Sequence, residues 1–189
     1  LEGCQQGGAE VEFIPLGNRK FSLCKACYEC LKKGECILND DLNEIRRKMI
    51  EADGIVIGSP TYCRGITGHL KAFFDRIWFD LRKQAFSGKY AVCVNTYIVS
   101  PGYSQRLLRD LTMALGYNIT GTVNAKLWRF DNEIERDVES MKKAFDAGLK
   151  LTKSINSQRG YRRQDLIRRL FIKPLFRNCL LYTSPSPRD

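Results

Sequence analysis

The sequence predicts an α/β domain with a doubly wound parallel sheet. Short apolar runs at 55–57 and 90–94, bounded by glycine or polar residues, are typical of strands buried on both faces. Longer stretches between these runs repeat their apolar residues at helical spacing. Because strands and helices alternate along the chain, the strands are expected to run parallel and to be covered by helices. Ligands of such sheets bind outside the carboxyl ends of the strands.

Residues 1–16 predict the end of a helix followed by a strand. Closely spaced glycines in residues 1–9 are typical of a helix stop, and residues 10–16 alternate as a strand does. A helix end followed by a strand indicates that further chain precedes both. The first residue is Leu1 rather than Met. We therefore expect this sequence to be a fragment of a longer protein.

Alternating helices and strands are expected after residue 40. Asp41 and Glu44 form a capping-box pattern, Thr67 is a typical helix N-cap, and Gly116 is typical of a helix end. The expected elements are helices over 41–50, 67–81, 105–115 and 133–155, and strands over 55–57, 90–95 and 119–123. The last helix carries an apolar stripe formed by Ile134, Val138, Met141, Phe145, Leu149 and Thr152.

Positive charge is concentrated near the carboxyl end of the chain. The 189 residues have a formal net charge of +10, and residues 157–178 carry seven basic residues against one acid, Asp165, which gives +6. We expect residues 1–156 to form one domain, truncated at its amino terminus. Residues 157–178 would be a basic extension with helical spacing, and 179–189 a disordered tail that resembles a cloning artefact.

Composition also argues against several classes of protein. No stretch approaches the roughly 18 apolar residues of a membrane span, and no signal peptide is found. Eight cysteines without a secretory signal indicate a reducing compartment, so we expect a cytoplasmic protein. The basic extension lacks a recognisable nucleic-acid-binding motif, so no nucleic-acid partner is expected.

The loop that follows the strand over 55–57 carries the strongest match to a known family. This stretch resembles the flavodoxin-like NAD(P)H-dependent FMN reductases, whose loop reads Ser-Pro-x-Tyr and precedes Gly-x-x-x-Gly-x-Leu-Lys-x-Phe-x-Asp-Arg. Gly65 and Gly68 stand one residue closer together here than in that form of the motif. The positions that match are Ser59, Pro60, Tyr62, Leu70, Lys71, Phe73, Asp75 and Arg76.

The resemblance implies a flavodoxin-like three-layer sandwich that binds FMN. In that family a first strand and a phosphate-binding loop precede the first helix, and both are missing from this sequence, so the strand over 10–16 would lack its neighbour. No catalytic side chain is expected, because hydride transfer to a flavin needs no protein base. The implied FMN contacts are Ser59, Pro60, Thr61, Tyr62 and Gly65, together with Asn95 and Thr96 after the next strand.

Four cysteines within thirteen residues form a candidate metal centre. Cys24, Cys27, Cys30 and Cys36 have the spacing C-x2-C-x2-C-x5-C. Disulfides between such close neighbours would strain the loop, and successive x2 spacings resemble an iron–sulfur run more than the two knuckles of a zinc site. A single [4Fe–4S] cluster is therefore favoured, and reduced thiols or zinc are the alternatives.

The same cysteine spacing is found in the iron–sulfur flavoprotein branch of the family, and the resemblance extends over residues 10–155. It implies electron transfer between a [4Fe–4S] cluster and FMN, with a small molecule or a redox protein as donor or acceptor and NAD(P)H as one candidate donor. It also implies a homodimer or a dimer of dimers. The alternatives are an NAD(P)H-dependent FMN or quinone reductase without a cluster, and a scaffold that acts through its basic extension.

Other conspicuous side chains are interpreted as structural. Cys93 lies in a predicted buried strand, and Trp78 and Trp128 are interpreted as packing residues. The pair Asp75 and Arg76 is expected to anchor the helix that follows the flavin loop.

Overall fold

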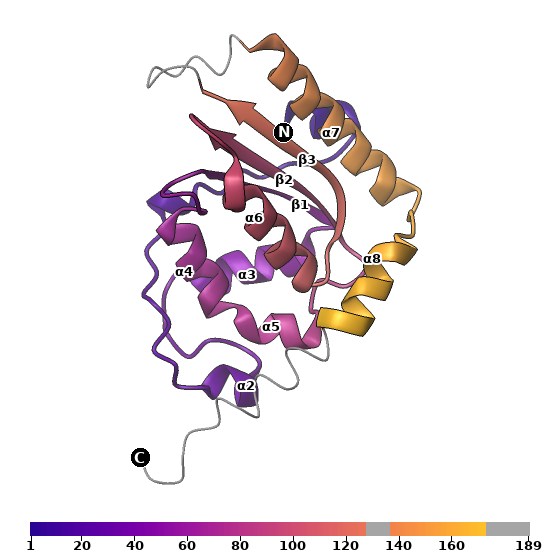
Figure 1. Cartoon of the computed structure of the whole chain (residues 1–189). Coiled ribbons are helices and arrows are strands. Elements are labelled where there is room, and N and C mark those ends of the chain that lie inside the picture. Colours follow the sequence, from indigo (N-terminus) through magenta and orange to yellow (C-terminus); the bar gives the residue numbers. More distant parts are fainter. Residues whose placement is uncertain (128–136, 173–189) are drawn as a thin grey trace.

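A computed structural model describes residues 1–127 and 137–172, in which helices cover both faces of a three-stranded parallel sheet (Figure 1). The strand order is β1-β2-β3, so the predicted α/β class is confirmed. The strands are β1 (Gly54–Pro60), β2 (Tyr90–Tyr97) and β3 (Asn118–Lys126). The helices are α1 (Glu2–Gln6), η1 (Leu16–Asn18), α2 (Glu29–Lys33), α3 (Leu42–Glu51), α4 (Gly68–Arg76), α5 (Trp78–Lys83), α6 (Gly102–Ala114), α7 (Val138–Asn156), α8 (Arg162–Ile167) and η3 (Arg168–Ile172).

Alternation along the central strand β2 divides the interior into two cores. Ala91 and Cys93 pack with α3, α4, α5 and α6, whereas Tyr90 and Val92 pack with α1 and α7 on the other face. Successive side chains of a strand point to opposite faces, so one strand serves both cores. Burial raises the pKa of the Cys93 thiol to about 11, as expected for a core residue.

The expected strand over 10–16 does not form. Residues 9–15 have no regular secondary structure, and η1 begins at Leu16. A strand needs a neighbour with which to exchange hydrogen bonds, and β1 pairs only with β2 in the described part of the chain. The apolar residues are used nonetheless, because Val11 packs against one core and Ile14 against the other.

Three helices differ from their predicted form, and the one predicted over 67–81 is divided at Ile77 into α4 and α5. Helix α3 has no capping box: the Asp41 carboxylate accepts from the Lys20 amide at 2.8 Å, and it is Asp40 that accepts from the Leu42 amide at 3.3 Å. Helix α7 buries Thr152 of the predicted stripe, but the stripe is wrong at the start of the helix, because Val138 is 75% exposed and Met141 is 41% exposed. Its buried positions are Ser140, Gly148, Leu151, Thr152 and Ser154. The predicted stripe residue Ile134 lies outside the described residues.

Small residues explain why α7 is turned in this way. A β-carbon on Gly148 would lie 2.9 Å from the Cys4 backbone nitrogen, and one on Gly3 would lie 2.1 Å from the Phe145 carbonyl oxygen. The backbones of α1 and α7 therefore touch at a pair of glycines. Close backbone approach selects the face with the smallest side chains, not the face with the largest apolar ones.

The basic extension covers the outer edge of β3. The Gln164 side chain accepts from the Ile119 amide at 2.9 Å and donates to the Ile119 carbonyl at 3.0 Å, as a neighbouring strand would. The buried Arg168 guanidinium donates to the Tyr117 carbonyl at 2.8 Å and to the Asn118 side chain at 2.9 Å. Polar side chains of this segment therefore attach it to the edge of β3. Its leucines do not, since Leu166 and Leu170 are exposed.

The length and composition of the described helices can be compared with those of a membrane span. None of those within residues 1–127 and 137–172 combines the length and the apolar composition of a membrane span.

The contact between α1 and α7 gives a stability prediction. Gly148→Ala places a methyl group against the backbone of α1, so we expect the free energy of unfolding to fall by about 1–3 kcal/mol. Denaturant unfolding followed by circular dichroism measures this change. The matched control is Gly160→Ala, whose added β-carbon meets nothing within 4 Å, and it should stay within about 0.5 kcal/mol of the parent. Equal unfolding midpoints for the two variants would contradict the prediction.

Candidate functional site

The loop between β1 and α4 is fixed at both of its ends. The Thr61 amide donates to the Thr96 carbonyl at 2.7 Å, which joins the start of the loop to the end of β2. At the other end, the Thr67 amide donates to the Ser59 hydroxyl at 3.0 Å, and Thr67 caps α4 by accepting from the Leu70 amide at 3.3 Å. The predicted N-cap is therefore confirmed, and the loop is held at the carboxyl edge of the sheet.

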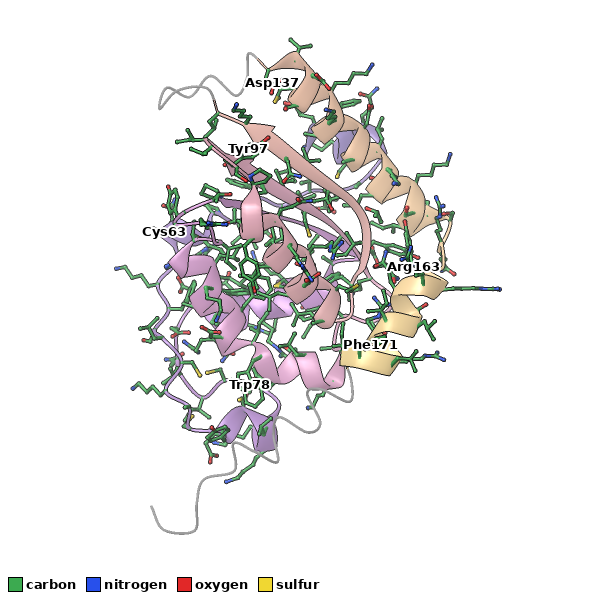
Figure 2. All side chains as sticks on the ribbon, in the orientation of Figure 1. Cys63, Trp78, Tyr97, Asp137, Arg163 and Phe171 are labelled. Carbon is green, nitrogen blue, oxygen red and sulfur yellow. The ribbon has the colours of Figure 1, made fainter. Side chains whose placement is uncertain are left out.

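The middle of this loop is a tight turn. The Tyr62 and Gly65 backbones exchange two hydrogen bonds of 2.9 Å. The two residues between them, Cys63 and Arg64, have φ values of 48° and 66°, the left-handed geometry that two-residue turns usually give to asparagine and glycine. The turn carries Cys63, Arg64 and Tyr62 at the surface, and Figure 2 shows Cys63 on the side of the molecule where α4 begins.

A buried amide supports the loop from behind. The Asn95 side chain is fully buried, and its oxygen accepts from the Thr61 hydroxyl at 3.1 Å and from the Ser104 hydroxyl at 3.0 Å. The Asn95 amide nitrogen is buried without a partner in the described part of the chain, as is the side-chain oxygen of Asn124, its register neighbour on β3. Unsatisfied polar atoms thus gather beneath the carboxyl edge of the sheet.

The structure brings the predicted flavin residues together. Ser59 is in register with Asn95, and Pro60 with Thr96, so the ends of β1 and β2 lie side by side beneath the loop. Ser59 and Asn95 are buried, whereas Thr61, Gly65 and Thr96 are partly exposed and Tyr62 is 64% exposed. A bound group at this edge would meet the exposed residues, and the buried pair would hold them in place.

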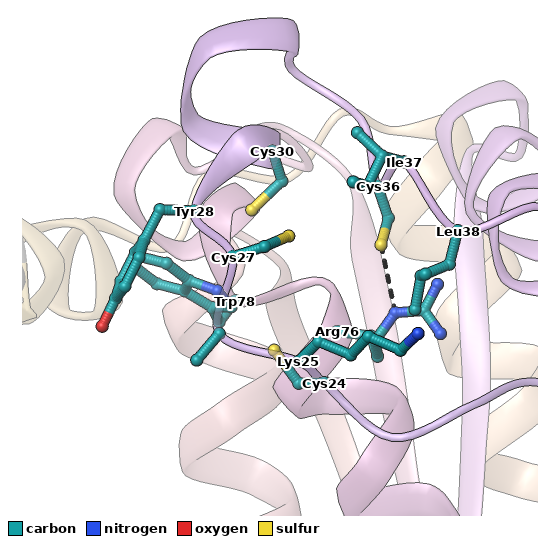
Figure 3. Close-up of a pocket in the computed structure, with 11 residues that line it drawn as sticks. Cys24, Lys25, Cys27, Tyr28, Cys30, Cys36, Ile37, Leu38, Arg76 and Trp78 are labelled. Atoms are coloured by element: carbon teal, nitrogen blue, oxygen red, sulfur yellow. Dashed lines mark hydrogen bonds between the residues drawn. The ribbon is translucent and has the colours of Figure 1, made fainter. Parts of the chain in front are cut away.

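The four clustered cysteines line a single pocket with Tyr28, Arg76 and Trp78 (Figure 3). Ala26 and Tyr28 have φ values of 51° and 57°, and these left-handed residues fold the loop back on itself. Cys24 and Cys27 are exposed, Cys36 is partly buried, and Cys30 on α2 is 8% exposed. The predicted metal ligands therefore face one space from three short segments of one loop.

The cysteine thiols are free and close enough to influence one another. All seven described cysteines are unpaired. Burial raises the pKa of Cys30, and negative charge on Cys36, Cys27 and Cys24 raises it further. Even so, no set of three or more His, Cys, Asp or Glu side chains within residues 1–127 and 137–172 is arranged to hold a metal ion. The donor set has the chemistry of a soft-metal site, and its sulfurs are not closed around a single ion.

A buried arginine joins the cysteine loop to the end of α4. Arg76 is 2% exposed, and its Nε–H donates to the Cys36 sulfur at 3.1 Å. Its terminal nitrogens donate to the two Asp40 carboxylate oxygens at 2.9 and 3.1 Å, and one of them also donates to the Ser22 carbonyl at 2.8 Å. Burial works against the Arg76 charge, but the hydrogen bonds to Asp40 and Cys36 outweigh it and raise the Arg76 pKa.

A second buried ion pair fixes the neighbouring helix α5. The Arg46 guanidinium donates to the two Asp80 carboxylate oxygens at 2.5 and 2.8 Å, and Asp80 is fully buried. This pair locks α3 to α5, the helix that starts with Trp78. The Trp78 ring meets Tyr28 edge-on, with centroids 6.3 Å apart, and so closes one wall of the cysteine pocket.

Sequence reasoning missed the surroundings of the cysteines. Arg76 was expected only to anchor its helix, and Trp78 only to pack in the core. One signal was available, because Arg76 follows Phe73 and Phe74 and precedes Ile77, so it lies in a strongly apolar helical segment. A cation in such a place needs a partner from elsewhere in the chain. Trp128, the other expected packing residue, lies outside the described residues.

Comparison with known proteins gives one family and a consistent set of relatives. The family described as NADPH-dependent FMN reductase matches residues 1–134. An iron–sulfur flavoprotein of Archaeoglobus fulgidus is 28% identical over 166 residues, which cover 84% of this chain and 71% of that protein. An iron–sulfur flavoprotein of Methanocaldococcus jannaschii is 40% identical over 89 residues, which cover 44% of this chain and 46% of that protein. The match thus spans less than half of this second relative.

Solved structures confirm the flavodoxin-like fold. A flavone reductase superposes with a TM-score of 0.61 at 19% identity, covering 82% of this chain and 56% of that chain. A flavodoxin from the domain Archaea superposes with a TM-score of 0.53 at 15% identity, covering 82% of this chain and 84% of that chain. At such identities the likeness establishes the fold and not the activity.

The Asp40–Arg76 pair predicts how stability depends on pH. Burial opposes ionisation of Asp40, but hydrogen bonds from Arg76 and from the Ser22 and Leu42 amides outweigh it and lower the Asp40 pKa. A lowered folded-state pKa contributes stability above the unfolded value of about 3.9, and that contribution is lost as pH falls through the folded value. We therefore expect the free energy of unfolding to fall as the pH drops below about 4, and to fall by less in the Asp40→Asn variant than in the parent.

The size of the Asp40 effect can be measured near neutral pH. Removing one partner of a buried pair leaves an uncompensated charge, so Asp40→Asn should lower the free energy of unfolding by about 3 kcal/mol. Asp75→Asn is the control, because its pair with Lys71 lies on the surface and should be worth less than about 1 kcal/mol. Equal losses in the two variants would show that the Asp40 pair is not the anchor of this region.

Proposed function

Because the chain belongs to the NADPH-dependent FMN reductase family, a family of flavin-dependent oxidoreductases, we propose that it binds FMN at the loop after β1 and an iron–sulfur cluster at the cysteine loop. The observation that carries the proposal is the convergence of four free thiols on one pocket beside a buried arginine. The relatives named iron–sulfur flavoproteins support the same assignment.

We assign FMN to the exposed part of the loop after β1. Bound FMN supplies chemistry in which either a hydride equivalent or single electrons are exchanged. Thr61, Tyr62, Gly65 and Thr96 would contact it, since they are exposed or partly exposed at the carboxyl edge of the sheet. Ser59 would fix the loop through Thr67. Pro60 and Asn95 complete the predicted set, Asn95 from its buried position under Thr61.

We assign a [4Fe–4S] cluster to Cys24, Cys27, Cys30 and Cys36. Thiolates are the preferred ligands of such clusters, and a bound cluster supplies one-electron chemistry. A structural zinc site usually takes two pairs of close ligands separated by a longer spacer, whereas three of these cysteines follow one another at successive x2 spacings. This spacing favours the cluster over zinc.

The placement of the two loops suits exchange of electrons between them. The flavin loop ends at Thr67, the cap of α4, and Arg76 at the other end of this helix contacts the cysteine loop. At about 1.5 Å per residue, nine residues separate the two ends by about 14 Å along the axis. The protein would convert between two-electron and one-electron partners, and its own residues hold and orient the two groups.

Donor, acceptor and assembly follow from the same proposal. NAD(P)H is one candidate donor, and a small molecule or a redox protein would serve as the other partner. We further propose a homodimer or a dimer of dimers acting in the cytoplasm, where the cysteines would stay reduced.

Metal and flavin content tests the proposed function. Anaerobically purified full-length protein should contain about four iron and four acid-labile sulfide atoms with one flavin per chain. Cys30→Ser should lose most of the iron and keep its flavin, whereas the core control Cys93→Ser should keep both. Flavin without iron in the parent protein would instead favour the alternative, an FMN or quinone reductase with no cluster.

The support beneath the flavin loop gives a further prediction. Asn95→Ala removes the acceptor of the Thr61 hydroxyl, so we expect FMN to bind roughly tenfold more weakly, about 1.4 kcal/mol, with iron content unchanged. Fluorescence titration with FMN measures the dissociation constant. Ser104→Ala is the matched control, because it leaves the Thr61–Asn95 hydrogen bond in place. Equal weakening by both substitutions would contradict the role given to Asn95.

A further inference from the structure

We infer that Arg76 is a positioning residue of the proposed cluster, and that its hydrogen bond to the Cys36 sulfur raises the reduction potential of that cluster. The inference rests on the proposed function, since it needs a cluster at the cysteine loop. It assigns to Arg76 a role beyond that of anchoring α4.

The guanidinium is oriented so that one N–H group is reserved for the sulfur. Asp40 takes a hydrogen bond from each of the two terminal nitrogens, at 2.9 and 3.1 Å. This end-on pairing leaves the Nε–H edge of the planar group free, and that edge faces Cys36 at 3.1 Å (Figure 3). Arginine offers its donors in a fixed fork, so the carboxylate that holds one edge also directs the other.

Burial makes this contact strong. The Arg76 side chain is 1% exposed and that of Asp40 is 13% exposed, so water and salt screen the charge little. A charge-assisted hydrogen bond in such a place is stronger than one between neutral groups. Cys36 is also the cysteine that stands apart in the motif, since it follows Cys30 by six positions whereas Cys24, Cys27 and Cys30 follow one another at intervals of three.

A donor to a ligating sulfur changes the redox balance in a defined direction. When one electron from an external reductant enters the cluster, the cluster and its thiolates gain one negative charge, and no bond is broken. An N–H group and a positive charge at the ligand sulfur stabilise this reduced state more than the oxidised one. The potential of the cluster should therefore be higher with Arg76 than without its Nε–H group.

The test is a redox titration of the full-length protein by visible absorption and electron paramagnetic resonance. Arg76→Lys keeps a positive charge near Asp40 and has no N–H group at the Nε position. We expect the ratio of reduced to oxidised cluster at a fixed potential to fall about tenfold, which is about 59 mV for one electron. The control is Lys71→Gln, which removes a charge from the surface of α4 without touching a cysteine, and its potential should equal that of the parent.

The outcomes separate this inference from the proposed function. If the parent protein contains iron and the Arg76→Lys variant has the same cluster potential as the parent, the role of Arg76 is overturned and the proposed cluster remains. A parent protein without iron would overturn both. If the lysine variant does not load iron, the double variant R76M/D40N removes both charges and leaves no N–H donor at the Nε position, so the same shift is measured there. An unchanged potential in the double variant would likewise overturn the inference.

Discussion

A positive charge buried at the carboxyl end of α4 constrains the half of the molecule that holds the cysteines. Arg76 lies among apolar side chains, and a cation there is tolerated only if other parts of the chain supply acceptors. Asp40, the Ser22 carbonyl and the Cys36 sulfur supply them. All three come from residues 22–40, so satisfying one guanidinium fixes both ends of the loop that carries the four cysteines.

Helix α4 connects the cysteine loop to the other candidate site, the loop after β1. Its first turn is capped by Thr67, which is tied back to Ser59 at the end of β1, and its last residue is Arg76. One rigid element therefore has the flavin loop at one end and the cysteine loop at the other. If the two sites hold the redox groups proposed for them, this fixed separation would suit electron exchange, because its rate depends steeply on distance. The family motif from Ser59 to Arg76 thus comprises the flavin loop and a helix whose last residue contacts the cysteine loop.

Local patterns predicted the parts of the fold that depend on local chemistry. The run at 90–95, the Thr67 cap and the turn at Gly116, whose φ is +118°, are all present. The predictions that failed depend on distant partners. Residues 10–16 have no strand to pair with in the described part of the chain, and the Asp41 carboxylate accepts from the Lys20 amide instead of capping its helix. Helix α7 turns toward its smallest residues because α1 approaches it at Gly3. The cysteine spacing likewise indicated a metal centre, but the Arg76 contact spans forty residues and leaves no local pattern.

The two candidate sites depend on different parts of this structure. The flavin loop starts from the pairing of β1 with β2, through the Thr61–Thr96 hydrogen bond and the Asn95 side chain. The outer edge of β1 has no strand neighbour in the described ranges, whereas the outer edge of β3 is covered by Gln164 and Arg168. The cysteine loop makes no use of a strand edge, because its supports are the ends of α3, α4 and α5. A disturbance at β1 should therefore weaken the flavin site first and leave the cysteine pocket standing.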